Sequence, residues 1–185
     1  MITKRKTKDK GTFNEMWVCP GGHVDLKAGK AESLRDAADR ECREELEYSV
    51  EIAAEPLGTY QAALWGRNRS YFIVFYEGMA PYNEFFDTEE VEAVCFVPCQ
   101  VVLDGLLRPS SYSSISVDEQ RARAESYPKL KGAALSQDGS SIVPCSFSLL
   151  EIVGDGGEGA GKGGLGMGHR FALECWHRKA TNKHK

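Results

Sequence analysis

Three glutamates at positions 41, 44 and 45 form the pattern in this chain with the clearest chemical potential. They lie at i, i+3 and i+4 within residues 32–46, a stretch whose periodicity predicts a helix. On a helix that turns about 100° per residue, Glu41 and Glu45 project into the middle of the apolar face, and Glu44 lies at its edge. The apolar members of that face are Leu34, Ala37, Ala38, Cys42 and Leu46.

Carboxylates placed in this way need a partner. Like charges at this spacing repel by about 0.2–0.5 kcal/mol per pair, and their burial without a partner would cost several kcal/mol more. A hard divalent cation removes both penalties, because Mg²⁺ and Mn²⁺ prefer carboxylate oxygens. The alternative is a charged surface helix with Arg35, Arg40 and Arg43 as partners. That alternative does not explain why Glu41 and Glu45 face the core.

The segment around this helix resembles the Nudix box, usually written G-x5-E-x7-R-E-U-x-E-E-x-G-U. Its charged positions are occupied in register by Glu32, Arg40, Glu41, Glu44 and Glu45. With its flanking strands the likeness covers about residues 2–107. It implies an α/β fold, a Nudix-type α/β/α sandwich around a mixed β-sheet. Within the family the chain is most similar to the animal nucleoside-diphosphate-linked moiety X motif 17 type, which also has W-V-x-P-G-G-H-V before the box and a late F-A-L-x-x-W segment, here Phe171 to Trp176.

The chain departs from the family pattern in three places. Four extra residues separate Gly22 from Glu32, so the loop before the helix is longer than usual. The glycine that ends the box helix is replaced by Glu47. Residues 2–5 resemble the end of a family strand, so we expect an N-terminally truncated form with an unpaired neighbouring sheet edge.

The resemblance implies a divalent-cation-dependent hydrolase that cleaves a phosphoanhydride with an activated water. The cation, Mg²⁺ or Mn²⁺, would neutralise the diphosphate and lower the pKa of a bound water. The implied metal ligands are the Gly22 carbonyl and the carboxylates of Glu41, Glu44 and Glu45. Glu41 and Glu44 are also catalytic candidates, because a carboxylate not fully engaged with metal can accept the proton of the water.

Three further residues take roles from the resemblance. Arg40 orients the glutamates through charge-assisted hydrogen bonds, and Glu32 braces the box loop. Glu90 matches the position of an additional catalytic glutamate, although an exposed turn carboxylate is an equal alternative. Which glutamate acts as the general base stays open at this point.

The residues that would select the substrate lie outside the box, in the loop 60–69. Tyr60 and Trp65 could stack on a base, and Arg67 and Arg69 could bind phosphate. The alternative is that these are exposed bystanders. We therefore expect a nucleotide-type small-molecule substrate, with capped RNA (mRNA decapping) as a close variant. The alternative function is a catalytically inactive Nudix module that binds nucleotide or RNA.

The amino-acid composition narrows the class of protein further. The 185 residues are 42% hydrophobic and 27% charged, which suits a soluble globular chain. A net charge of −4 gives no global basic field for DNA, and no run approaches the roughly 20 apolar residues of a membrane span. We expect an intracellular, cytoplasmic protein, with nucleus and mitochondrion left open. Six cysteines without a CxxC pair indicate reduced thiols rather than zinc. The oligomeric state is not indicated.

We predict a Nudix hydrolase domain over residues 1–153 with a loop-rich insertion at 108–141. Nine glycines within 154–168 indicate a flexible linker, and 169–185 form a short helix with a basic tail. A polar loop is expected at 23–33, and a short helix at 99–107. The expected strands are 16–19, 50–64, 71–78 (buried), 91–98 and 146–153.

Overall fold

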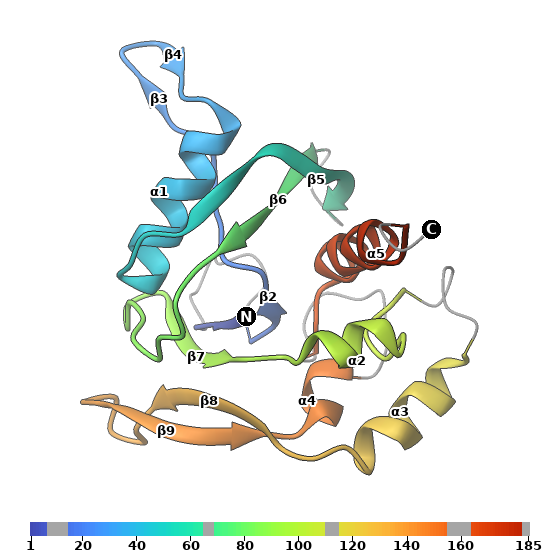
Figure 1. Cartoon of the computed structure of the whole chain (residues 1–185). Helices are drawn as coiled ribbons and strands as arrows, with labels where there is room; N and C mark the ends of the chain where they lie inside the picture. The colour runs from blue at the N-terminus through green and yellow to red at the C-terminus, as the bar shows by residue number, and fades with distance from the viewer. Residues whose placement is uncertain (7–14, 65–68, 110–114, 155–163, 183–185) are drawn as a thin grey trace.

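The computed structural model describes residues 1–6, 15–64, 69–109, 115–154 and 164–182. Its larger sheet has five strands in the order β2-β1-β7-β8-β9 (Figure 1). The strand bounds are Trp17–Val18 (β2), Ile2–Arg5 (β1), Val91–Cys95 (β7), Leu130–Leu135 (β8) and Ile142–Phe147 (β9). All neighbouring strands in it run antiparallel, and β1 pairs on both sides, with β2 and with β7.

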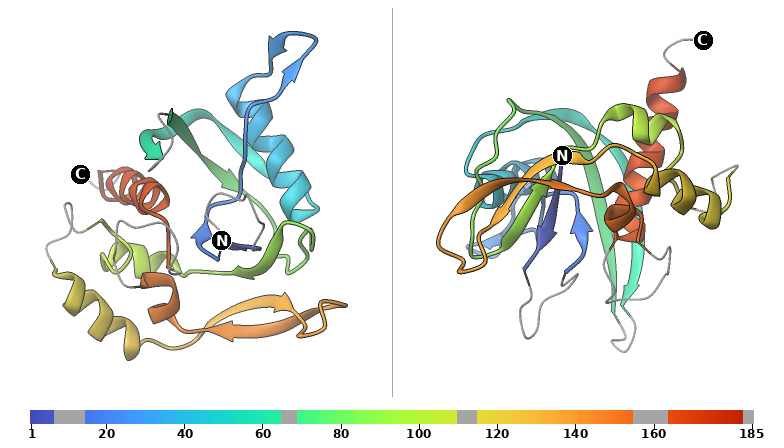
Figure 2. Two further views of the ribbon diagram at one scale, coloured as in Figure 1. Left: turned by 180° about the vertical axis from the view of Figure 1, so that it is seen from behind. Right: turned by 90° about the horizontal axis from the view of Figure 1, so that it is seen from below.

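A long antiparallel ribbon forms the second sheet of the fold. It consists of β5 (Glu51–Leu64) and β6 (Arg69–Met79). Helix α1 (Leu34–Leu46) lies on one side of this ribbon and α5 (Met167–Asn182) on the other, as Figures 1 and 2 show. Tyr76 of β6 packs against Cys42 and Leu46 of α1, whereas Tyr60 of β5 contacts Phe171 of α5. The predicted α/β class is confirmed. A single parallel bridge, Trp17 with Leu165, accompanies the antiparallel pairs of the described residues.

The main core lies between the five-stranded sheet and the helices that cover one of its faces. These helices are α2 (Cys99–Leu103), α3 (Val117–Glu125), α4 (Leu149–Val153) and α5. Its buried side chains include Ile2, Trp17, Cys95, Val101, Leu107, Leu149 and Ile152. Full burial of one such aliphatic or aromatic side chain contributes about 1.5–3 kcal/mol. None of the helices among the described residues is long and apolar enough to cross a membrane.

Helix α1 begins and ends with identifiable caps. The Ser33 hydroxyl accepts a hydrogen bond from the Asp36 N–H (3.1 Å), and the helix starts at Leu34, inside the predicted range. At the other end Glu47 adopts a left-handed conformation with φ of 58°, and its N–H donates to the Arg43 carbonyl (3.0 Å). The conformation usually supplied by glycine is therefore kept by a glutamate.

The prediction of a long loop over 108–141 is wrong, because α3 and β8 lie within it. Ser116 caps α3 by accepting the Glu119 N–H (3.2 Å). The centre of strand β8 consists of small residues, which give no strong strand signal in the sequence. A Cβ at Gly132 would collide with the Val94 carbonyl, so the close approach of β8 to β7 depends on this glycine.

The prediction of one strand over 146–153 is also wrong. Strand β9 ends at Phe147, and α4 begins at Leu149. The change occurs at Ser148, because its side chain and that of Glu151 form a reciprocal capping box. The cap signal therefore outweighs the run of apolar residues that follows it.

Smaller corrections concern three other segments. The expected polar loop at 23–33 contains the short hairpin β3 (Leu26–Lys27) and β4 (Lys30–Ala31). Strand β6 is not buried throughout, since Phe72 is 72% exposed. Residues 155–163 of the predicted linker lie outside the described residues, but Leu165 is buried and its N–H donates to the Ile152 carbonyl (2.7 Å). The division into a domain, a linker and a tail stays a prediction.

Candidate functional site

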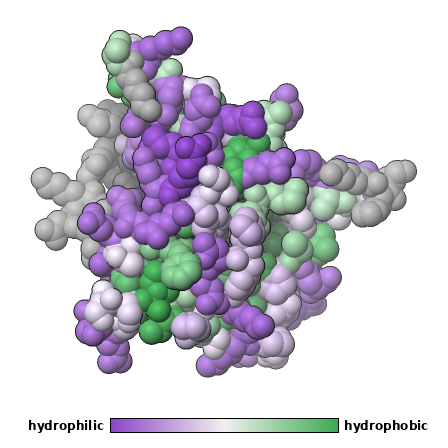
Figure 3. Space-filling view, turned by 60° about the vertical axis from the view of Figure 1, so that its left-hand side comes forward, coloured by the Kyte–Doolittle hydropathy of each residue, from purple (hydrophilic) through white to green (hydrophobic). Residues whose placement is uncertain are grey.

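A cleft of about 440 Å³ opens beside the C-terminal half of α1. The turn around Gly22 and the loop before β7 form its other walls. Five carboxylates and one guanidinium line it, so its surface carries an excess of negative charge. The lining residues are Arg5, Gly22, His23, Glu41, Glu44, Glu45, Asp87 and Glu90. In the space-filling view of the face that carries α1, hydrophilic residues dominate the centre, with hydrophobic patches below (Figure 3).

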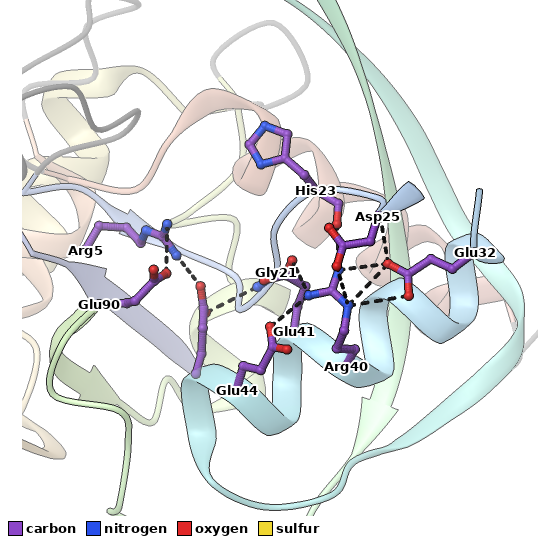
Figure 4. Close-up of polar contacts among 10 residues, drawn as sticks. Arg5, Gly21, His23, Asp25, Glu32, Arg40, Glu41, Glu44 and Glu90 are labelled. Atoms are coloured by element: carbon purple, nitrogen blue, oxygen red, sulfur yellow. Dashed lines mark hydrogen bonds and ion pairs between the residues drawn. The ribbon is translucent and has the colours of Figure 1, made fainter. Parts of the chain in front are cut away.

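Arg40 stands at the centre of a charged network on α1 (Figure 4). Its guanidinium donates hydrogen bonds to Glu32 (2.8 Å), Glu41 (2.9 Å) and Glu44 (2.8 Å). It also donates to the backbone carbonyl of His23 (2.8 Å). The hydrogen bond to Glu32, and then those to the other two glutamates, raise the pKa of Arg40 above its ordinary value. Arg40 therefore joins the helix to the turn that precedes it.

Glu32 connects this network to the β3–β4 hairpin. Its carboxylate accepts the Asp25 N–H (2.9 Å), and its own N–H donates to the Asp25 carbonyl (3.1 Å). The hairpin is thus closed at its base by Glu32 and held against α1 by Arg40. This geometry shows how the longer loop between Gly22 and Glu32 is accommodated: the β3–β4 hairpin projects beyond the N-terminal end of α1 (Figure 1).

Glu45 is the most deeply buried carboxylate of the cleft, with 1% of its side chain exposed. It forms an ion pair with Arg5 of β1 and accepts the Gly21 N–H (3.3 Å). Burial raises the pKa of Glu45 from 4.5 to about 7, while the charge of Arg5 and the Gly21 hydrogen bond act in the opposite direction. Burial thus disfavours the charged form of this carboxylate, and nearby positive charge favours it.

Gly21 and Gly22 shape the turn that faces these carboxylates. Gly21 has φ of +148°, a value that side chains rarely adopt, and this brings its N–H to Glu45. Gly22 lies so close to Glu41 that an added Cβ would occupy the position of the carboxylate group. Only glycine leaves room for the carboxylate of Glu41 in this position.

Glu90 lies across the cleft from α1, on the loop before β7. Its carboxylate, 40% exposed, pairs with Arg5 (3.5 Å). The loop is attached to α1, because the Asp87 N–H donates to the Glu45 backbone carbonyl (2.9 Å). The structure therefore brings Glu90 and the three glutamates of α1 to one cleft. The catalytic and metal-binding roles of these residues stay predictions.

The sequence did not single out Arg5, Asp87 or the cleft position of His23. Arg5 belongs to a basic stretch near the N-terminus, and in the structure it ends β1 and lines the cleft. The strand pairing is irregular at this point, because Lys4 pairs with Ala93 whereas Arg5 pairs with Val91. The only sequence signal was the resemblance of residues 2–5 to a family strand.

The predicted substrate-binding residues do not meet in the cleft. Tyr60 packs against Phe171 of α5, with ring centroids 5.6 Å apart, and it is not among the lining residues. Trp65 and Arg67 lie outside the described residues, as does the side chain of Arg69. His23, which does line the cleft, contacts Tyr71, and their ring centroids are 5.9 Å apart.

The chemistry of the cleft fits a hard divalent cation. Its charged donors are carboxylates, and the turn at Gly22 adds backbone oxygen, the donor set that Mg²⁺ and Mn²⁺ prefer. Among the described residues no three His, Cys, Asp or Glu side chains are already gathered as a ready-made metal site. Arg40 contacts one oxygen each of Glu41 and Glu44, whereas both oxygens of Glu45 are engaged, one by Arg5 and the other by the Gly21 N–H. A cation at Glu45 would therefore have to exchange places with Arg5.

Comparisons with known proteins agree with this geometry. The family model described as NUDIX domain matches residues 1–116, which include α1, the cleft and Glu90. No curated protein and no solved structure matches the chain.

Proposed function

Because the chain belongs to the Nudix hydrolase family, we propose that it is a divalent-metal-dependent pyrophosphohydrolase. Its substrate would be a nucleoside diphosphate linked to another moiety, cut at the phosphoanhydride. The observation that carries this proposal is the convergence of Glu41, Glu44, Glu45 and Glu90 on one cleft. A cleft with this much negative charge repels a diphosphate unless cations occupy it, which links substrate binding to metal.

The three glutamates of α1 and the Gly22 carbonyl are the groups that would hold Mg²⁺ or Mn²⁺. When bound, the metal neutralises the diphosphate and lowers the pKa of a coordinated water. The positioning of these glutamates is the work of other residues of the chain. Arg40 keeps Glu41 and Glu44 beside each other by donating to both, and the closed hairpin at Glu32 keeps Arg40 in place.

Glu90 is our candidate for the residue that accepts the proton of the attacking water. It faces the α1 glutamates from the opposite wall, and its half-exposed carboxylate can reach solvent in the cleft. Glu41 and Glu44 remain the alternatives. A general base contributes typically about 10²–10⁴-fold to the rate, so variants of these residues separate the candidates by turnover.

The finer assignments are also proposals. The W-V-C-P-G-G-H-V and F-A-L-E-C-W segments support the motif 17 type of Nudix hydrolase. Capped RNA would be cut by the same chemistry at the phosphate bridge of its cap. We also propose that the protein lies inside the cell, in the cytoplasm, because its six cysteines are free thiols, as is usual in reducing compartments.

The experiment that tests this function is hydrolysis of a panel of diphosphate-linked nucleotides and capped RNA in H₂¹⁸O. Parallel reactions contain Mg²⁺, Mn²⁺ or a chelator, and ³¹P NMR identifies the products and the phosphorus that receives ¹⁸O. We expect metal-dependent release of a nucleoside monophosphate or its equivalent. Nucleotide or RNA binding without turnover in any reaction would instead support the inactive Nudix module.

A further inference from the structure

Arg5 occupies a position in the cleft that no role described so far explains. Its guanidinium bridges the two walls: one nitrogen pairs with Glu45 of α1 and another with Glu90 (3.5 Å) of the loop before β7 (Figure 4). The side chain of Arg5 is 25% exposed, whereas that of Glu45 is 1% exposed. Arg5 is thus the cation of the cleft lining that reaches its most buried carboxylate.

The backbone is built to direct Arg5 there. Lys4, the preceding residue of β1, pairs with Glu92 (3.1 Å), which is not among the residues that line the cleft. Consecutive residues of a strand point to opposite faces of the sheet, so Lys4 and Arg5 enter different environments. The register shift between them places Arg5 opposite Val91, the residue after Glu90.

We propose that Arg5 is an internal counter-ion that competes with the divalent metal for Glu45. Without metal, Arg5 neutralises this carboxylate and allows it to be buried. A divalent metal held by Glu45 would replace Arg5 at the oxygen that Arg5 contacts, because the other oxygen already accepts the Gly21 N–H and two cations at one oxygen repel. Metal binding therefore releases the Arg5 guanidinium from Glu45.

The released side chain gains a second task, and this part rests on the proposed function. Arg5 is anchored at the end of β1, at the edge of the cleft in which the diphosphate would bind. A guanidinium matches the geometry of phosphate oxygens with two parallel hydrogen bonds. Arg5 is thus a positioning residue whose partner changes from a carboxylate to a phosphate once the metal is in place.

The test compares metal binding by the full chain, its Arg5→Met variant and its Lys4→Met variant, without substrate. The two variants remove the same charge from the same strand, but only Arg5 enters the cleft. We expect the calorimetric Kd for Mn²⁺ to fall about tenfold or more in Arg5→Met, because a competing charge is removed. The Kd of Lys4→Met should stay within about twofold of the parent, since exposed pairs contribute little.

A second measurement does not depend on the stability of Arg5→Met. In the parent, the ¹⁵N side-chain signal of Arg5, assigned with Arg5→Lys, should shift when Mg²⁺ is added, because its contact with Glu45 is lost. An unchanged Arg5 signal in the metal-loaded parent, or equal Kd values for the parent and Arg5→Met, would overturn the competition.

The outcomes separate this proposal from the function of the enzyme. A tighter Kd in Arg5→Met, together with no hydrolysis of any substrate, would support the counter-ion and overturn the pyrophosphohydrolase. Metal-dependent hydrolysis by the parent, together with an unchanged Kd for metal in Arg5→Met, would support the pyrophosphohydrolase and overturn the counter-ion. Failure of both the parent and Arg5→Met to bind Mn²⁺ or Mg²⁺ would overturn both. If Arg5→Met hydrolyses nucleotides with the parent's KM, only the phosphate contact is contradicted.

Discussion

Gly22 and Glu41 lie so close together that the absent side chain of the glycine leaves the space in which the carboxylate sits. Gly22 comes from the turn after β2, and Glu41 projects from α1, so the contact joins two walls of the cleft. Because the carboxylate is the flexible end of a side chain, pressure from Gly22 would move it without unfolding the helix.

Replacement of Gly22 by alanine is therefore expected to damage function more than stability. The added Cβ displaces the Glu41 carboxylate, and misplacement of a reacting group by about 1 Å can reduce the rate about 100-fold. Metal titration, turnover and thermal unfolding measure the separate effects. Gly139→Ala is the matched control: Gly139 has φ of +70° in a distant turn, so alanine there should lower Tm and leave metal binding unchanged. Equal losses of Tm without any loss of turnover in Gly22→Ala would contradict the contact.

The end of α1 offers a prediction about stability alone. A residue with a side chain adopts the left-handed conformation at a cost of about 1–2 kcal/mol, which glycine avoids. Glycine, however, loses more conformational entropy on folding, which offsets about 0.5–1 kcal/mol of this gain. Glu47→Gly should therefore stabilise the protein by about 0.5–1 kcal/mol and raise Tm by about 1–4 °C. Glu47→Ala removes the same charge but keeps the Cβ, so its Tm should stay near that of the parent. A gain of equal size in both variants would assign the effect to charge instead.

The raised pKa of Glu45 predicts how pH acts on the metal-free fold. Because burial raises this pKa from 4.5 to about 7, the folded chain keeps a proton that the unfolded chain has lost. The resulting stability is complete below about pH 4.5 and is lost as pH rises through about 7. His169 acts in the opposite direction at lower pH, because burial, followed by the charge of Arg5, lowers its pKa from 6.5 to about 4.

The two titrations are separated by subtraction. Glu45→Gln lacks the titration of Glu45 and keeps that of His169. In metal-free solution, Tm of the variant minus Tm of the parent should therefore increase as pH rises from about 5 to 8. In the parent, the increase in Tm on addition of Mg²⁺ should become larger over the same range, since metal binding requires the carboxylate. Parallel Tm curves for the two proteins would contradict a raised pKa at Glu45.

The box helix could be predicted from sequence because its information is local. The spacing of Glu41, Glu44 and Glu45 on an apolar face fixes their side of the helix, and a serine cap lies directly before it. The partner of Glu45 could not be predicted, because Arg5 is forty residues earlier in the chain and is brought to the cleft by sheet pairing and a bulge. A basic residue at the end of a short strand carries no sign of such a contact.

The other differences also arise from long-range packing. Tyr60 has the chemistry of a base-stacking residue, but strand pairing turns it toward α5, where Phe171 covers it. Strand β8 contains Gly132 and two alanines, which give no strong strand signal on their own. Its position between β7 and β9 supplies the hydrogen bonds that the local sequence does not indicate.

The most direct test of the central claim is the turnover of the parent, Glu45→Gln and Glu47→Gln on one diphosphate-linked nucleotide, each with and without Mg²⁺. Both variants lose one negative charge at the end of α1, but only Glu45 lines the cleft. We predict that turnover requires Mg²⁺, that Glu45→Gln reduces it about 100-fold or more with its fold intact, and that Glu47→Gln retains it. Metal-independent turnover, or a Glu45→Gln protein as active as the parent, would contradict the assignment of this cleft as a metal-dependent catalytic site.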